Sequence, residues 1–230
     1  MKVIGIIGGM SWESTQHYYQ LMNQYVHAKL GRHNSIEAII YSVNFERILI
    51  LIHQGEWELV GQSMIHLAVK LEMAGAEFLI LTSNAVHKFF SQIEAAIKIP
   101  ILHIADPTAK AIQKAGMKKV GLLGTKVTME EQFYKQRLLD HGIEALVPED
   151  RDREFLHKII FDELTVGKIH DDSRGKLIGL IAKLKKRGAE GIILGCTELI
   201  QLISQKDTHI PLFDTTALHA HAAVDFACAK

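Results

Sequence analysis

The chain has 230 residues, and its 26 Lys and Arg residues balance 26 Asp and Glu residues, so the formal net charge is zero. Hydrophobic residues make up 48% and charged residues 23%, a globular composition that excludes wholesale disorder. Nucleic-acid binding requires clustered Lys and Arg, and the balanced charge without a long basic run argues against such a partner.

The two cysteines, Cys196 and Cys228, are too few for a disulfide scaffold or a paired-cysteine metal motif. The apolar run at residues 3–7 is too short for a membrane span or the core of a signal peptide. We therefore expect a cytoplasmic protein with reduced thiols and no membrane partner.

Short apolar and β-branched runs alternate with longer helical patterns along the chain. Strands are predicted at residues 3–7, 38–41, 78–81, 101–103, 120–123 and 192–194, and helices at residues 14–30, 57–74, 129–140 and 177–187. Continuous apolar runs of this length suit strands that are covered on both faces. The alternation predicts a doubly wound α/β fold.

Three segments recur in the same order at nearly one offset. The sequence MKVIGIIG at residues 1–8 is echoed by MKKVGLLG at residues 117–124. Residues 75–83 are echoed by 188–196, and residues 99–102 by 210–213. Three ordered matches indicate two similar α/β halves that arose by duplication.

The repeats place the first half at residues 1–110 and the second at residues 111–210, with residues 211–230 packing back on the first half. Ligands of open α/β sheets bind beyond the carboxyl ends of the strands. Two such halves, related by a pseudo-twofold axis, predict one ligand site in the cleft between them.

Cys196 is the strongest candidate for chemistry, because it follows a predicted strand at the turn into the next helix. Amide donors and the positive end of a helix at this place would lower the pKa of a thiol. Thr197 and Glu198 follow in what would be the first helical turn. The alternative is that Cys196 is a small, inert core residue.

Ser83 is the counterpart of Cys196 in the first half, and with Asn84 it offers hydrogen-bonding groups at the end of a predicted strand. Ser83 could instead cap a helix that begins near Ala85. The turn that contains Gly9, Met10 and Ser11 follows the first strand and can present backbone amides to a carboxylate or phosphate. Its spacing is neither a dinucleotide fingerprint nor a Walker loop.

The turn at Thr125 echoes this glycine-rich turn and predicts a second anion-binding turn. The thirteen histidines form no H-E-x-x-H or similar motif, so we predict no metal.

The residues Gly8-Gly9-Met10-Ser11-Trp12-Glu13-Ser14-Thr15, Leu123-Gly124-Thr125, Leu194-Gly195-Cys196-Thr197-Glu198 and Phe213-Asp214-Thr215 together resemble the aspartate/glutamate racemases. The resemblance runs through nearly the whole chain. It implies two similar α/β domains with the active site between them, no cofactor, no metal and a homodimer. It also implies a small amino-acid substrate and proton transfer at the α-carbon by two thiols, one on each face.

This sequence departs from the family pattern at one thiol, because Ser83 stands where the family has its first cysteine. By the resemblance, the turn Gly9-Met10-Ser11 and the pair Ser83-Asn84 bind one carboxylate and the amino group, and Thr125 and Cys196-Thr197 bind the other end. Glu198 either orients the site or meets the substrate ammonium. With Cys196 as the one strong base, we expect a racemase that prefers the L enantiomer. Two alternatives stay open: an asymmetric racemase, in which Ser83 or a water donates the proton on the far face, and a protein that has lost racemisation.

Two other functions compete with racemisation. A decarboxylase or isomerase of a dicarboxylic acid would need one cysteine, as in the related arylmalonate decarboxylases. A non-catalytic protein that binds an acidic amino acid would use Ser83 as a ligand contact alone.

Overall fold

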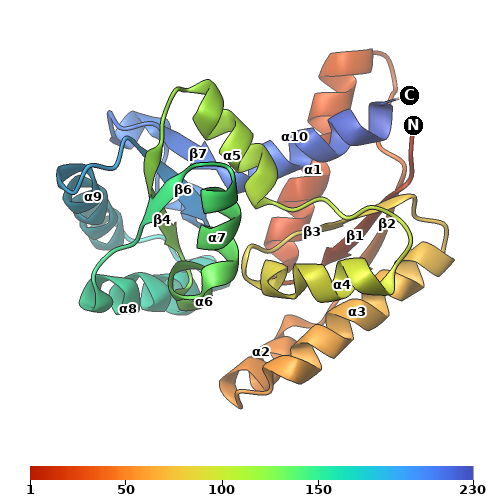
Figure 1. The fold of residues 1–230 in the computed structure, drawn as a ribbon, viewed down its shortest axis with the longest axis horizontal. Helices are drawn as coiled ribbons and strands as arrows, with labels where there is room; N and C mark the ends of the chain where they lie inside the picture. The colour runs from red at the N-terminus through yellow and green to blue at the C-terminus, as the bar shows by residue number, and fades with distance from the viewer. Residues whose placement is uncertain (230) are drawn as a thin grey trace. The chain divides into compact units, whose positions relative to one another are not determined.

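The computed structural model describes residues 1–229, which form two compact α/β units (Figure 1). Unit 1 contains Met1–Ile104 and the chain from His219 onward, and unit 2 contains Ala105–Leu218. The chain therefore passes from unit 1 to unit 2 after Ile104 and returns at His219. The return lies inside the last helix, α10 (Thr215–Cys228).

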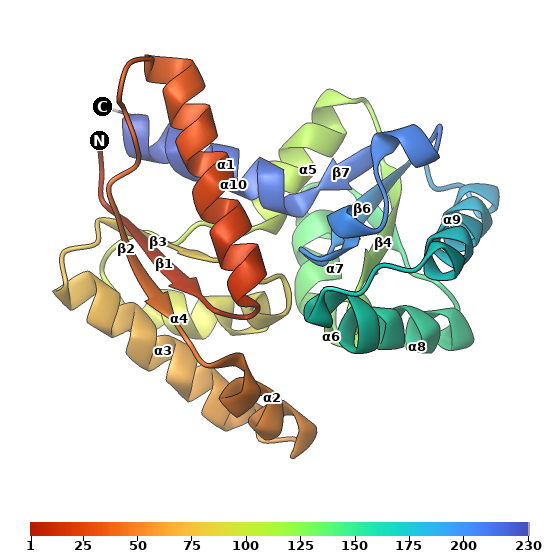
Figure 2. The same cartoon turned by 180° about the vertical axis from the view of Figure 1, so that it is seen from behind.

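Unit 1 is built on a parallel sheet in the order β2-β1-β3. Its elements are β1 (Ile4–Gly8), α1 (Trp12–Leu30), β2 (Ala38–Ser42), α2 (Phe45–His53), α3 (Trp57–Met73), β3 (Phe78–Leu81), the 3-10 helix η1 (Ala85–Phe89) and α4 (Phe90–Ala96). Alternate strand residues face opposite sides. Phe78 and Ile80 pack with α1 and α10, whereas Leu79 and Leu81 pack with α3 and α4 (Figure 2).

Unit 2 is built on a four-stranded parallel sheet in the order β5-β4-β6-β7. Its strands are β4 (Lys119–Gly124), β5 (Glu144–Leu146), β6 (Gly191–Gly195) and β7 (Leu212–Asp214). Its α-helices are α5 (Ala105–Lys114), α6 (Lys126–Glu130), α7 (Gln132–Asp140), α8 (Asp150–Lys158) and α9 (Asp171–Lys186), and short helices of other types span Ile159–Glu163, Leu164–Val166, Leu199–Gln201 and Gln205–Asp207. Helices α8 and α9 cover one face of the sheet. Helix α5 contacts β7, and helix α7 contacts β5.

In each unit the first strand lies between the next two strands of the chain. In unit 1, β1 lies between β2 and β3, and in unit 2, β4 lies between β5 and β6. Helices cover both faces of both sheets, so the predicted doubly wound α/β fold is confirmed.

The structure corrects two of the predicted elements. Residues 101–103 make a single bridge, Leu79 to Ile101, because the chain turns into α5 directly afterwards. The helix predicted at residues 129–140 is divided, because Glu131 has an extended backbone between α6 and α7.

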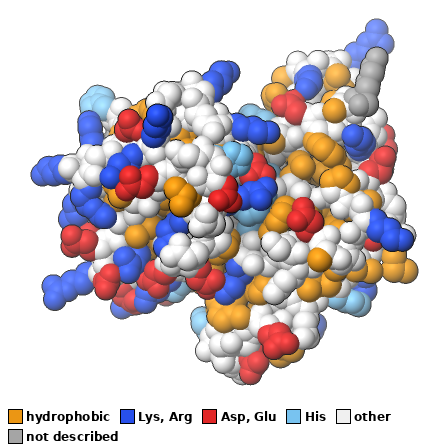
Figure 3. All heavy atoms as spheres, viewed as in Figure 1, with side chains coloured by type: hydrophobic (Ala, Val, Ile, Leu, Met, Phe, Trp, Pro, Cys, Tyr) orange, Lys and Arg blue, Asp and Glu red, His pale blue; other side chains and the backbone are white. Residues whose placement is uncertain are grey.

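The surface differs between the two units. Lys and Arg side chains gather where α8 and α9 lie, and hydrophobic side chains reach the surface over unit 1 (Figure 3). The exposed hydrophobic residues of unit 1 include Ile50 of α2 and Leu59 of α3. None of the helices in residues 1–229 combines the length and the apolar composition that a bilayer crossing requires.

Candidate active site

The glycine-rich turn of unit 1 joins β1 to α1. Gly9 has a φ of +89°, and a Cβ there would lie 2.4 Å from the Val43 carbonyl oxygen. Only glycine fits this place without a shift of backbone. Ser11 caps α1, because its hydroxyl accepts a hydrogen bond from the Ser14 N–H at 3.3 Å. Met10 and Ser11 are both buried.

Thr15 connects this turn to the end of β3. Its hydroxyl oxygen accepts the Gly9 N–H at 2.8 Å and donates to the Ser11 carbonyl at 3.1 Å. The same oxygen lies 3.1 Å from the Thr82 hydroxyl, next to Ser83. A single threonine therefore fixes the glycine-rich turn against the loop that carries Ser83. Sequence reasoning missed this role, and the nearest signal was the position of Thr15 at the end of the family-like motif.

Ser83 and Asn84 follow β3 as predicted, but Ser83 does not cap a helix. Asn84 occupies the N-cap of η1 and makes no side-chain capping bond there. Ser83 is half-buried, and within residues 1–229 its hydroxyl makes no hydrogen bond. The Ser83 hydroxyl is thus available to a ligand of unit 1.

Two glycines let the functional loops of unit 2 approach each other. Gly124 ends β4 and is the register partner of Gly195, which ends β6. A Cβ on Gly195 would lie 2.8 Å from the Leu123 carbonyl, and one on Gly124 would lie 2.7 Å from the Gly195 carbonyl. Backbone atoms cannot move aside without distorting the sheet. The two glycines therefore determine how closely the strand ends before Thr125 and Cys196 approach each other.

Thr125 is the N-cap residue of α6, and its hydroxyl lies 3.3 Å from the Thr128 hydroxyl. Thr128 is fully buried under the Gly124 and Gly195 pair, where it would meet a Cβ on either glycine. It is the counterpart in unit 2 of Thr15, which packs against Gly8 in the same way. Both strand ends are therefore supported by a buried threonine from the following helix.

The thiol of Cys196 is buried and hydrogen-bonded. It donates to the Glu198 carboxylate at 3.0 Å, and the Thr197 hydroxyl donates to the same oxygen at 2.7 Å. Cys196, Thr197 and Glu198 are all buried. Burial raises the pKa of the Cys196 thiol well above its ordinary value, and the Glu198 carboxylate raises that pKa further.

This result corrects the expectation of a lowered thiol pKa. The sequence suggested that Cys196 opens a helix, but the chain forms only the three-residue 3-10 helix Leu199–Gln201 after Glu198. The carboxylate of Glu198 places a negative charge beside the thiol. Cys196 therefore rests in its protonated form.

The Phe213-Asp214-Thr215 motif has a structural role in unit 2. Asp214 accepts the Thr216 N–H at 2.9 Å and the Ala217 N–H at 3.2 Å, so it caps the start of α10. The Thr215 hydroxyl donates to the Leu194 carbonyl at 2.9 Å, which ties the start of α10 to β6, the strand that precedes Cys196.

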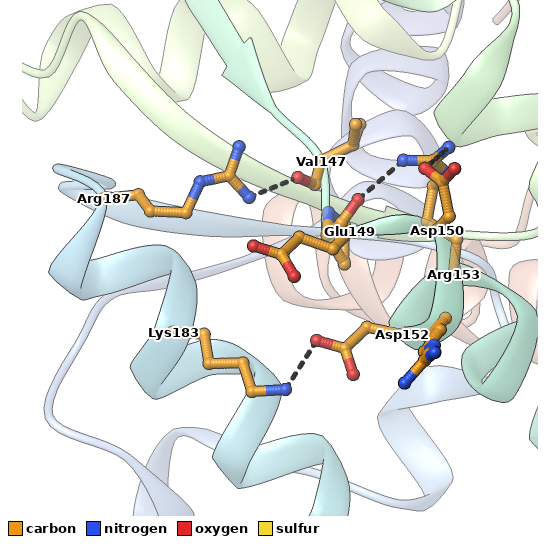
Figure 4. Close-up of a pocket in the computed structure, with 9 residues that line it drawn as sticks. Val147, Glu149, Asp150, Asp152, Arg153, Lys183 and Arg187 are labelled. Atoms are coloured by element: carbon orange, nitrogen blue, oxygen red, sulfur yellow. Dashed lines mark hydrogen bonds and ion pairs between the residues drawn. The ribbon is translucent and has the colours of Figure 1, made fainter.

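A cavity of about 640 Å³ on unit 2 lies apart from these residues, between the start of α8 and the end of α9. Figure 4 shows Lys183 pointing to Asp152 and Arg187 pointing to the carbonyl of Val147, both at 2.7 Å. Lys183 is thus paired with a carboxylate and Arg187 with a backbone carbonyl, and no predicted site residue lines the cavity. Within residues 1–229 no three His, Cys, Asp or Glu side chains form a group that could hold a metal ion.

Comparison with known proteins settles the family. Residues 7–223 match the Asp/Glu/Hydantoin racemase family. The chain belongs to this family. The predicted resemblance is confirmed, and the protein is an isomerase of the racemase type.

Three relatives of this racemase extend over its whole length. A Yersinia pestis protein assigned to the Asp/Glu racemases is 47% identical with a TM-score of 0.93, and each chain is covered completely. An aspartate racemase homologue from Pyrococcus horikoshii OT3 is 38% identical with a TM-score of 0.86, also over 100% of both chains. The broad specificity amino-acid racemase RacX of Bacillus subtilis is 27% identical over 227 residues, 96% of each chain.

Proposed function

We propose that this racemase transfers the α-proton of an acidic amino acid without a cofactor and prefers the L enantiomer. The observation that carries the proposal is the buried Cys196 thiol bonded to the Glu198 carboxylate. It is the one thiol at a strand end in the predicted site, since Cys228 lies at the end of α10. Aspartate and glutamate are the substrates we expect.

The substrate itself is suited to activate the thiol. Cys196 must lose its proton to act as a base, and the Glu198 charge opposes that loss. A substrate α-ammonium beside Glu198 would offset this charge and lower the thiol pKa toward the working pH. The thiolate then takes the α-proton and becomes a thiol again. An empty enzyme keeps its thiol protonated and unreactive.

Unit 1 supplies the groups that would stabilise the carbanion. Backbone amides of the Gly9–Ser11 turn and the side chain of Asn84 can donate to the α-carboxylate as it takes on enolate character. Thr125 and Thr197 supply hydroxyls for the other end of the substrate. In this proposal Cys196 serves one face of the α-carbon and Ser83 the other.

Ser83 explains the preference for one enantiomer. A serine hydroxyl is a much weaker acid than a thiol, so it is not a ready base. The hydroxyl of Ser83, or a water beside it, would instead give a proton to the carbanion and be reprotonated by solvent. Fast proton removal is then confined to the face that Cys196 serves. The homodimer stays a prediction of the family resemblance, and the cytoplasmic location stays a prediction from the sequence.

A second candidate function follows from the protonated state of Cys196. A single cysteine that rests as a thiol is ready to donate a proton to a product carbanion. Decarboxylation of a dicarboxylic acid needs that donor and no second thiol. The same turns would bind its carboxylates.

The deciding experiment is α-proton exchange in D2O, followed by ¹H NMR on separate samples of L and D aspartate and glutamate. We expect fast loss of the α-proton signal from the L samples and much slower loss from the D samples. Equal rates for both enantiomers would refute the proposed preference. No exchange from any proteinogenic amino acid, together with turnover of a malonate, would instead establish the decarboxylase.

Changing Ser83 to cysteine should restore a base on the second face. We expect S83C to exchange the D enantiomer at a rate approaching that of the L enantiomer, because a thiol ionises far more readily than a hydroxyl. The measurement is the same exchange assay. S91C, on the exposed part of α4, adds a thiol elsewhere in unit 1 and should change nothing. If S83C keeps the single-enantiomer preference, Ser83 does not face the α-carbon.

A further inference from the structure

We propose that His87 is a positioning residue for the Ser83 loop, acting as a neutral imidazole that links the Ser83 carbonyl to the Ile104 amide. A second proton on this ring breaks the link. The role of the loop in catalysis rests on the proposed function, whereas the protonation state of His87 does not.

The two hydrogen bonds define the tautomer. Nδ1 of His87 lies 2.8 Å from the Ser83 carbonyl oxygen, which can only accept, so Nδ1 carries the proton. The Ile104 N–H points to Nε2 at 3.2 Å and can only donate, so Nε2 carries none. His87 is therefore neutral in this arrangement.

The surroundings keep the ring in place. His87 is 1% exposed, so it cannot turn toward water without opening unit 1. The ring of Phe90 from α4 lies parallel to it, with centroids 6.5 Å apart. The titratable rings that face His87 are His103 at 4.7 Å and His219 of α10 at 5.8 Å. The neighbouring Lys88 is directed elsewhere, since its Nζ lies 4.0 Å from the centre of the Trp57 ring.

The same segment has a second anchor. Nε2 of His219 donates to the Leu102 carbonyl at 3.1 Å, and its Nδ1 lies 3.1 Å from the Tyr18 hydroxyl of α1. Residues 102–104 are thus held from two sides just before the chain leaves unit 1. Through His87, the position of Ser83 depends on this held segment.

A second proton on His87 has a direct geometric consequence. It would place an N–H on Nε2 facing the Ile104 N–H, so two donors would oppose each other in a buried site. The Ile104 bond must then break, and the Ser83 carbonyl loses its fixed support. We infer a second acid limb in the activity, which originates in unit 1 and adds to the limb set by the Cys196 thiol.

The first test uses ¹⁵N-histidine labelling and needs no substrate. Two-bond ¹H–¹⁵N spectra at pH 7.5 should show His87 as the neutral Nδ1–H tautomer. Amide hydrogen exchange should show a protected Ile104 N–H, with that protection lost in H87L and retained in H87Q. Glutamine offers an N–H donor and a carbonyl acceptor but takes up no proton. H66Q, on the exposed face of α3, is the matched control and should change neither signal.

The second test is kinetic. In H87L we expect kcat for α-proton exchange to fall about 10- to 100-fold with KM little changed, because the loop is misplaced. Where His87 takes up a second proton, wild-type kcat should fall more steeply with decreasing pH than loss of the Cys196 thiolate alone requires, and this extra fall should vanish in H87Q. The H66Q control should keep the wild-type profile.

The outcomes separate this inference from the proposed function. An Nε2–H tautomer or a charged His87 at pH 7.5, or a second acid limb that persists in H87Q, would overturn the inference even in an active racemase. If no amino acid exchanges, the proposed function fails. The tautomer and the Ile104 protection in H87L then still decide whether His87 holds the loop.

Discussion

Replacing Cys196 with alanine is expected to slow α-proton exchange from the L substrate by about 10²- to 10⁴-fold, the usual contribution of a positioned acid or base. The variant keeps the buried volume nearly filled and should fold. In wild type, burial and Glu198 hold the thiol pKa high, so the thiolate fraction and the exchange rate should rise with pH through neutrality. The rate–pH profile in D2O measures both effects.

The matched control is Cys228→Ala. Cys228 is the other free cysteine and ends α10 in unit 1, whereas Cys196 belongs to unit 2. C228A should keep the wild-type rate and pH profile. Exchange by C196A at the wild-type rate would rule out Cys196 as the base. A second variant, E198Q, removes the charge that raises the thiol pKa and should move the rising limb to lower pH.

The second large effect concerns Gly195. Adding a Cβ there should lower the free energy of unfolding by about 3 kcal/mol, because overpacked sites that cannot relax cost this much. The Cβ would lie 2.8 Å from the Leu123 carbonyl and 2.9 Å from a Leu122 methyl group. The backbone carbonyl belongs to the β4 and β6 ladder, so relief requires the strands to separate. Urea unfolding of G195A measures the loss.

Gly179→Ala provides the matched control in the same unit. Gly179 lies within α9, and a Cβ there meets nothing within 4 Å. Alanine in a helix interior should stabilise the protein by about 0.5 to 1 kcal/mol relative to glycine. If G195A and G179A unfold at the same urea concentration, the close approach of the two strands is not essential to unit 2.

The strands that are apolar throughout could be predicted from the sequence, because burial on both faces gives an uninterrupted run of apolar residues. Strand β5 at Glu144–Leu146 was missed, since it is a short edge strand and only half-buried. The segment at residues 101–103 looks like a strand but pairs only at Ile101. The segment is a buried linker that leads out of unit 1. Sequence periodicity does not distinguish a buried linker from a buried strand.

The candidate site shows the same limit. The positions of Ser83 and Cys196 at strand ends followed from the repeat, because local sequence defines where a strand stops. The protonation of Cys196 did not follow, since it depends on burial and on the direction of the Glu198 side chain. The supporting contacts of Thr15 with Thr82 and of His87 with Ile104 join residues far apart in sequence. Such contacts arise only after folding, so no local pattern marks them.

Unit 1 is built from two separate stretches of the chain, and the second stretch is synthesised only after unit 2. Ala220, Ala223, Val224 and Ala227 of α10 complete the core on one face of the β1–β3 sheet, and the Lys2 N–H donates to the Ala227 carbonyl at 2.9 Å. In the order of synthesis these residues come after every strand of unit 2. The strands of unit 2 are therefore all synthesised while one sheet face of the N-terminal unit is covered by α1 without α10. Nascent chains stalled before His219 should expose that face to chaperones, although the segment was made first.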